Sequence, residues 1–250
     1  MRYQRRVAAS STPVSADKIT LRFFKNPAPV PALTMQTIDG RTISSADWRG
    51  KVTLINFWAT WCPPCKAEIP DLIALQDKYR DQLQVIGISE DEGSPDVVKR
   101  FVADHQINYP VVMTTPELER LFAGVAALPT SFIVDRDARI VQKHVGMLNA
   151  TTTEGETRVL AGLRIDAAIE YVEPDQAVGL ANAAQAKAIP GIDLTRLTPS
   201  QRTETLQRLN AEPCTCGCGL TVAKCRVDDP TCPVSLPIAR KIADEIAAKP

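Results

Sequence analysis

The pattern of apolar and polar residues changes in a regular order along the first 150 residues. Residues 33–43 alternate between apolar and polar positions around an Asp-Gly pair, which is typical of a β-hairpin. Residues 52–58 and 85–89 are short, nearly continuous apolar runs rich in Val and Ile. Such runs predict strands that are buried on both faces of a mixed or parallel sheet.

Helical patterns alternate with these runs. We expect helices over residues 62–80, 94–105 and 116–122, and further strands over residues 110–113, 130–134 and 139–145. Pro70 stands inside the first helix and predicts a kink there. After the hairpin the order is βαβαβαββ, which predicts an α/β sandwich: a mixed sheet flanked by helices, with an N-terminal β-hairpin.

The pattern changes again after residue 150. We expect helices over residues 158–171, 176–188, 199–210 and 236–248. The third has the clearest start, because Thr198 can cap it, Pro199 suits its first position and Gln201 completes a capping box. We therefore divide the chain into a disordered leader (1–26), an α/β domain (27–150), a helical linker region (151–197) and a small Cys-rich helical module (198–250).

The composition limits the kinds of partner that this protein is expected to bind. The 250 residues carry 29 basic and 29 acidic side chains, so no net charge favours nucleic acid or an anionic membrane surface. No stretch approaches the roughly 20 apolar residues that span a bilayer. The first ten residues are basic but lack the apolar run of a signal peptide. We expect a cytoplasmic protein, or an exported one whose signal is missing from this version.

Two of the seven cysteines, Cys62 and Cys65, stand at the start of the first expected helix. Backbone N–H groups and the helix dipole favour the thiolate of the first cysteine there, and thiolate is the nucleophilic form. We therefore expect Cys62 to exchange with a substrate disulfide and Cys65, further in and less exposed, to resolve the mixed disulfide. A pair of buried cysteines or half of a zinc site is the alternative.

Two segments resemble the TlpA/ResA branch of thioredoxin-like proteins. The first is residues 56–70, with Trp-Cys-Pro-Pro-Cys at its centre, and the second is residues 124–135, which contain Leu-Pro-Thr. The motifs occur in the order and spacing of that family, and the resemblance covers about residues 27–150. It implies a thioredoxin-like sandwich and a thiol–disulfide oxidoreductase without a cofactor or a metal at its redox centre.

The resemblance also implies roles for single residues. Pro129 corresponds to the cis-proline that faces the disulfide, although an ordinary proline leading a strand is the alternative. A cis bond there would present backbone groups to an extended substrate segment. The residues expected to bind substrate are Trp61, Pro63, Pro64, Leu128 and Thr130.

A carboxylate follows the second cysteine. Glu68 stands three residues after Cys65, on the same helical face. In the ResA-like branch the matching Glu lies near the cysteines, which makes Glu68 the candidate for handling the Cys65 proton. A solvated helix carboxylate is the alternative. Thioredoxin proper has Asp where this chain has Asn56, and Asn cannot ionise.

The remaining five cysteines lie within nineteen residues of the C-terminal module: Cys214, Cys216, Cys218, Cys225 and Cys232. They are compatible with structural disulfides, with a thiolate metal site or with further redox thiols. The two histidines, His105 and His144, are distant in sequence, so a metal here would need cysteine ligands alone.

The sequence thus predicts an oxidoreductase for dithiols and disulfides of proteins, with apocytochrome c or other exported proteins as candidate substrates, supplied by an upstream electron donor. The resemblance favours a periplasmic or other extracytoplasmic location, with the cytoplasm as alternative. A peroxiredoxin-like enzyme would need proline at position 55 and threonine at position 59, where this chain has Ile55 and Ala59. A thiolate protein that binds or delivers metal is the third class.

Overall fold

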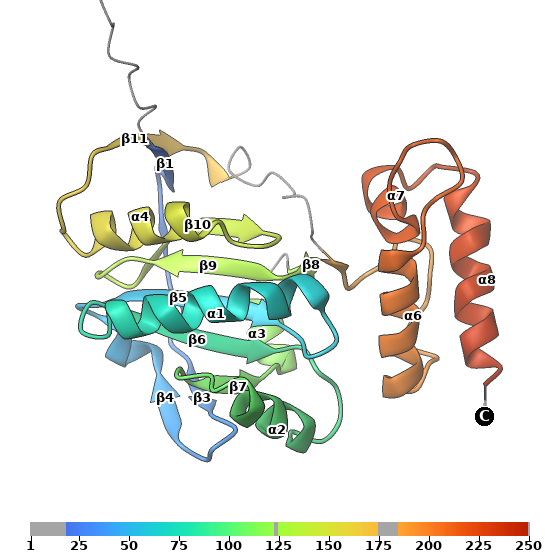
Figure 1. The fold of residues 1–250 in the computed structure, drawn as a ribbon, viewed down its shortest axis with the longest axis horizontal. Coiled ribbons are helices and arrows are strands. Elements are labelled where there is room, and N and C mark those ends of the chain that lie inside the picture. The colour runs from blue at the N-terminus through green and yellow to red at the C-terminus, as the bar shows by residue number, and fades with distance from the viewer. Residues whose placement is uncertain (1–18, 123–124, 175–184, 250) are drawn as a thin grey trace, which may run out of the picture.

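A mixed sheet forms the centre of the larger lobe in Figure 1. The computed structural model describes residues 19–122, 125–174 and 185–249. In spatial order the strands are β2 (Ala28–Pro29), β10 (Arg139–Val145), β9 (Thr130–Val134), β5 (Val52–Trp58), β6 (Leu83–Ser89) and β7 (Val111–Met113). β5, β6 and β7 are parallel, whereas β9 and β10 run antiparallel to their neighbours. The predicted mixed sheet is confirmed.

Helices flank this sheet, as the βαβαβαββ order predicts. They are α1 (Pro63–Lys78), α2 (Asp96–Asp104), α3 (Pro116–Leu121) and α4 (Ala150–Leu160). α1 crosses the face of the sheet that is turned to the viewer in Figure 1. Every residue of β5 is buried, which explains its continuous apolar run. The predicted hairpin is present as β3 (Thr34–Gln36) and β4 (Thr42–Ser44), followed by the short 3₁₀ helix η1 (Ser45–Trp48).

The expected leader is too long. Ile19–Phe24 forms β1, a strand that pairs in parallel with β11 (Ala167–Val172). Leu21 and Phe23 are buried in the core of the larger lobe, so the apolar residues of this segment belong to the fold. Residues 1–18 lie outside the described part of the chain.

The helix expected over residues 158–171 is also wrong. α4 ends at Leu160, and Gly162 follows with a positive φ of 76°, a conformation that ends a helix readily. The β-branched and aromatic residues of β11 then pair with β1. The helical periodicity of this stretch is weak, and the strand forms because it pairs with β1, which lies about 150 residues away in sequence.

The C-terminal segment forms a smaller lobe (Figure 1). Its elements are β12 (Gln185–Ala186), α6 (Pro199–Ala211), α7 (Val222–Asp228) and α8 (Ser235–Ala247). The capping box of Thr198 and Gln201 is present at the start of α6, as predicted. Of the helix expected over residues 176–188, the part up to 184 lies outside the described residues. The next two residues form β12, so the prediction is wrong there.

The smaller lobe has a hydrophobic cluster of its own, separate from that of the sheet. Its buried members are Ala186, Ile189, Leu206, Leu209, Cys214, Val222, Ala223, Cys225, Cys232, Ala239, Ile242 and Ile246. The division of the chain into domains remains a prediction. None of the helices in the described ranges is both long and apolar enough to traverse a bilayer.

Candidate active site

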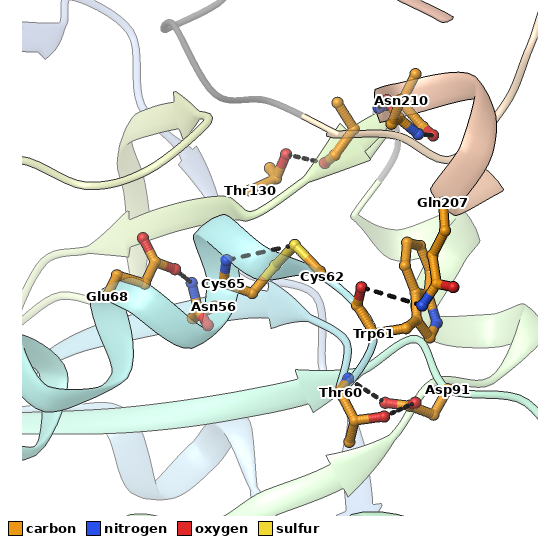
Figure 2. Close-up of a disulfide and its surroundings, with 12 residues drawn as sticks. Asn56, Thr60, Trp61, Cys62, Cys65, Glu68, Asp91, Thr130, Gln207 and Asn210 are labelled. Atoms are coloured by element: carbon orange, nitrogen blue, oxygen red, sulfur yellow. Dashed lines mark hydrogen bonds between the residues drawn. A yellow bond between two sulfur atoms is a disulfide. The ribbon is translucent and has the colours of Figure 1, made fainter. Parts of the chain in front are cut away.

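Cys62 and Cys65 form a disulfide at the start of α1 (Figure 2). Their sulfur atoms are 2.07 Å apart, and their Cα atoms are 5.3 Å apart. Cys62 is the N-cap residue of the helix, and its Sγ accepts a hydrogen bond from the backbone N–H of Cys65 at 3.3 Å. The sulfur therefore lies over the unsatisfied N–H groups of the first turn, where negative charge is favoured.

The turn before the disulfide is fixed by a carboxylate. Asp91 accepts hydrogen bonds from the backbone N–H of Thr60 at 2.9 Å and from its Oγ1 at 2.5 Å. Pro63 occupies the first turn of α1, where its missing N–H costs nothing. The redox ring is thus anchored between the C-terminal end of β5 and the next helix.

The expected difference in exposure between the two cysteines is absent. Cys62 and Cys65 both have an exposed fraction of 0% in this disulfide-bonded state. Trp61, which precedes Cys62, packs against the core of the sheet and against the cluster of the smaller lobe. The smaller lobe therefore lies against the redox segment and contributes to its burial.

The Leu128–Pro129 peptide bond is cis, as the resemblance implied. It joins the short strand β8 (Ala127–Leu128) to β9. Thr130 donates a hydrogen bond from its Oγ1 to the carbonyl of Ala127 at 2.7 Å and so closes the turn around the proline. The carbonyl of Pro129 accepts from the N–H of Gly146 at 2.8 Å.

The other residues expected to bind substrate lie on the segments around this ring. Trp61 is half-buried and Pro63 is exposed, whereas Pro64, Leu128 and Thr130 are buried. Their part in substrate binding remains a prediction.

Glu68 is a buried carboxyl group, which rules out the solvated alternative. Its exposed fraction is 2%. Oε1 accepts a hydrogen bond from Asn56 Nδ2 at 2.7 Å, and Oε2 accepts from the backbone N–H of Leu148 at 2.9 Å. Burial raises the pKa of Glu68 to about 7, against the two hydrogen bonds, which lower it. Such a group gains and loses protons near neutral pH.

Asn56 positions this carboxyl group, a role that sequence reasoning missed. Its Nδ2 also donates to Ser131 Oγ at 3.0 Å, so the amide is held between α1 and β9. Figure 2 shows its hydrogen bond to Glu68. A single amide in the middle of a buried apolar strand was the available signal, because buried polar groups are rarely left unpaired.

A pocket gives Glu68 a route to solvent. Its volume is about 220 Å³, and it lies between α1 and α4. Glu68 and Leu148 form part of its wall, together with Thr153 and Glu154 of α4. Because Glu68 lines this pocket, its carboxyl group can exchange protons with solvent there.

Comparison with known proteins agrees with this geometry. Residues 27–143 match the AhpC/TSA family. The thiol–disulfide oxidoreductase ResA of Bacillus thuringiensis (strain Al Hakam) is 32% identical over 141 residues, which cover 56% of this chain and 79% of that protein. The thioredoxin-like protein YneN of Bacillus subtilis (strain 168) is 32% identical over 126 residues, 50% of this chain and 74% of the relative.

The chain belongs to the ResA-type thiol–disulfide oxidoreductases. A thiol:disulfide interchange protein of the thioredoxin family from Chlorobium tepidum TLS has the same fold, with a TM-score of 0.52 and 36% identity over 55% of this chain and 98% of that one. The predicted fold, family and enzyme class are confirmed. Membership in this family implies that the substrates are protein thiols. The peroxiredoxin-like and metal-delivery alternatives are not better supported than this oxidoreductase class.

The five C-terminal cysteines of this ResA-type protein are free thiols in the structure. Four of them form one group in which every Sγ lies within 4.8 Å of the others: Cys214, Cys216, Cys225 and Cys232. The exposed Cys218 is outside the group. The structural disulfides considered from the sequence are not formed here.

The raised pKa of Glu68 predicts how stability depends on pH. The unfolded chain loses this proton near pH 4.5 and the folded protein near pH 7, so stability falls as pH rises through that window. The loss amounts to roughly 3 kcal/mol, the free-energy equivalent of the difference between these two pKa values. Urea unfolding of the oxidised protein from pH 4.5 to 8 should show this slope, and Glu68→Gln should flatten it.

The control for this measurement is Asp77→Asn, at an exposed position near the other end of α1. It should leave the pH slope as in the wild-type protein. A Glu68→Gln slope equal to that of the wild type would show that the carboxyl group ionises as freely in the folded protein as in the unfolded chain.

Proposed function

We propose that Cys62 is the attacking thiol, Cys65 the resolving thiol and Glu68 the group that exchanges a proton with Cys65. The position of the Cys62 sulfur supports the first role: it caps α1 and accepts the Cys65 N–H, so the protein favours its thiolate. This observation carries the proposal. The burial of Glu68, three residues after Cys65 on the same helix, supports the third role.

The exchange then runs in two steps. In the reduced protein the Cys62 thiolate attacks one sulfur of a substrate disulfide, which forms a mixed disulfide and releases the other substrate sulfur as a thiolate. Cys65 gives its proton to the Glu68 carboxylate and attacks Cys62 Sγ. The second substrate sulfur leaves, Cys62 and Cys65 form a disulfide, and two electrons have passed to the substrate. An upstream dithiol restores the reduced state, and the same steps in reverse would oxidise a substrate.

The backbone before cis-Pro129 is our candidate for holding an extended substrate segment, with Trp61, Pro63 and Thr130 around it. Strand addition supplies backbone hydrogen bonds whatever the substrate sequence, which suits an enzyme with several partners. Exported proteins, including apocytochrome c, are the proposed substrates, and an extracytoplasmic location is proposed with them. Both rest on the resemblance of residues 27–150 to ResA-like proteins, and the cytoplasm is the alternative location.

Single cysteine variants test the two thiol roles. Cys65→Ser should accumulate mixed disulfides with a protein substrate, because the attacking thiolate remains and nothing resolves the adduct. Cys62→Ser should form few adducts and lose reductase activity. Non-reducing electrophoresis and mass spectrometry after incubation with oxidised insulin measure both. Equal trapping by the two variants would contradict the assignment.

A further inference from the structure

The C-terminal module brings cysteines from three segments to one point. The loop between α6 and α7 is closed by two backbone hydrogen bonds, from Cys214 N–H to the Leu220 carbonyl (2.8 Å) and from Val222 N–H to the Glu212 carbonyl (2.9 Å). Gly217 turns this loop with a φ of 90°, a conformation that glycine adopts without strain. The loop supplies two cysteines of the group.

The other two cysteines come from α7 and from the turn that follows it. Cys225 is buried in α7, and Cys232 is buried in the turn before α8, where its N–H donates to the Asp229 carbonyl at 3.1 Å. Because hydrogen-bonded backbone holds each segment, the four sulfur atoms are positioned by the fold rather than by long flexible side chains.

The distances between the sulfur atoms suit a tetrahedral ion. The Cys214 and Cys216 sulfurs are 3.3 Å apart, and those of Cys216 and Cys225 are 3.9 Å apart. Four thiolates around Zn²⁺ at about 2.3 Å have sulfurs about 3.8 Å from one another. Two disulfides would instead bring the atoms together in pairs, whereas here all four contact one another within 4.8 Å.

We propose that Cys214, Cys216, Cys225 and Cys232 bind one Zn²⁺ ion as four thiolates. Binding releases the thiol protons to solvent and leaves the oxidation state of metal and sulfur unchanged. An all-sulfur tetrahedral set selects zinc over the hard cations, which prefer oxygen. The module has only a small apolar cluster, and small cores of this kind usually need a metal or disulfides to hold them.

Metal analysis of the full chain tests this site, with Cys62 and Cys65 replaced by serine in every sample so that the redox pair cannot bind metal. Protein reduced, loaded with Zn²⁺ and desalted should carry one zinc per chain. Cys225→Ser should bind Zn²⁺ roughly a hundredfold more weakly or worse in competition with a chromophoric chelator, since it removes one of four ligands. Cys218→Ser is the matched control and should keep the zinc.

Cobalt gives a second readout that does not depend on the folding of the Cys225 variant. Co²⁺ in place of zinc should give the intense visible absorption of a tetrahedral thiolate site, and Cys216→Ser, at an exposed position, should change it. Protein that binds neither metal, disulfides mapped among the four cysteines, or equal loss in the Cys218 control would each overturn the proposal.

A second, independent observation concerns strand β12. Its residues pair antiparallel with β8, Gln185 opposite Leu128 and Ala186 opposite Ala127, and Lys187 N–H continues the ladder to the Ala126 carbonyl at 3.0 Å. This edge of β8 directly precedes cis-Pro129. The chain's own C-terminal segment thus lies on the backbone that we propose for an extended substrate.

Side chains hold β12 on its other side. Asn210 of α6 accepts from Ala186 N–H at 2.7 Å and donates to the Ala186 carbonyl at 2.8 Å. Lys187 Nζ forms ion pairs with Glu90 at 2.5 Å and with Glu119 at 3.2 Å. The segment is therefore fixed both to α6 and to the lobe that carries the disulfide.

α6 adds contacts beside the redox ring. Arg202 pairs with Glu92 at 2.6 Å, and Gln207 Nε2 reaches the Trp61 carbonyl at 3.5 Å (Figure 2). The second of these contacts is made to the residue directly before Cys62, whose exposed fraction is 0%. α6 therefore packs beside the segment that carries the buried Cys62.

We infer that residues 185–187 compete with protein substrates for the edge of β8, so that the C-terminal module restrains disulfide exchange until it moves away. This inference rests on the proposed function. A substrate strand can pair with residues 126–128 only after β12 has left them, because an edge strand offers one row of hydrogen-bonding groups.

Charge reversal at Lys187 tests the restraint. Lys187→Glu places a carboxylate against Glu90 and Glu119, which should displace β12 and raise the initial rate of insulin reduction roughly fivefold. Lys241→Glu, an exposed change on α8, is the control and should leave the rate unchanged. Hydrogen exchange at residues 126–128 and 185–187 should quicken in the Lys187 variant alone.

An unchanged or lower rate in a Lys187→Glu protein whose β12 amides exchange faster would overturn the restraint. That result is distinct from failure of the proposed function, in which neither the wild-type protein nor either variant would reduce insulin at all.

Discussion

The buried carboxyl group of Glu68 is the constraint on which the active site depends. A carboxylate removed from water must be paired, and here Asn56 of the central strand and the N–H of Leu148 supply its two hydrogen bonds. These contacts join β5, α1 and the connection before α4 around the redox helix. Burial and hydrogen bonding act in opposite directions on the carboxyl group, and burial prevails, so the pKa rises to about 7. The fold thus keeps on the redox helix a buried carboxyl group that gains and loses its proton near neutral pH.

Features set by local chemistry were predictable from the sequence. The Cys-Pro-Pro-Cys helix start, the buried strand before it and the capping box at Thr198 each depend on neighbouring residues, and each was predicted. The cis state of the Leu128–Pro129 bond came from a family motif, and the structure has it.

Features that depend on distant partners were missed. β1 and β11 pair with each other although they are far apart in the sequence, so neither has a strong signal alone. The two residues of β12 are a strand only because β8 and Asn210 offer hydrogen bonds on both sides. The complete burial of both active-site cysteines was likewise missed; next to Cys62, Trp61 packs against the hydrophobic clusters of both lobes, a contact between segments far apart in the sequence.

The two lobes contribute different groups to the protein. The larger lobe, with the family's fold, supplies the dithiol and its buried acid. The C-terminal module adds four clustered thiols and a strand that lies on the edge of β8. A metal bound by these thiols would join the α6–α7 loop, α7 and the turn before α8, and so stabilise the module whose strand lies on β8.

The pH dependence of the resolving step tests the central role of Glu68 most directly. The mixed disulfide between Cys62 and a chromogenic thiol can be formed and its decay followed by stopped-flow absorbance from pH 5 to 9. If Glu68 takes the Cys65 proton, the rate should rise with pH through a pKa near 7, as the carboxylate forms, and the Glu68→Gln protein should be slower and lack this rise. The same profile and rates in both proteins would contradict this role.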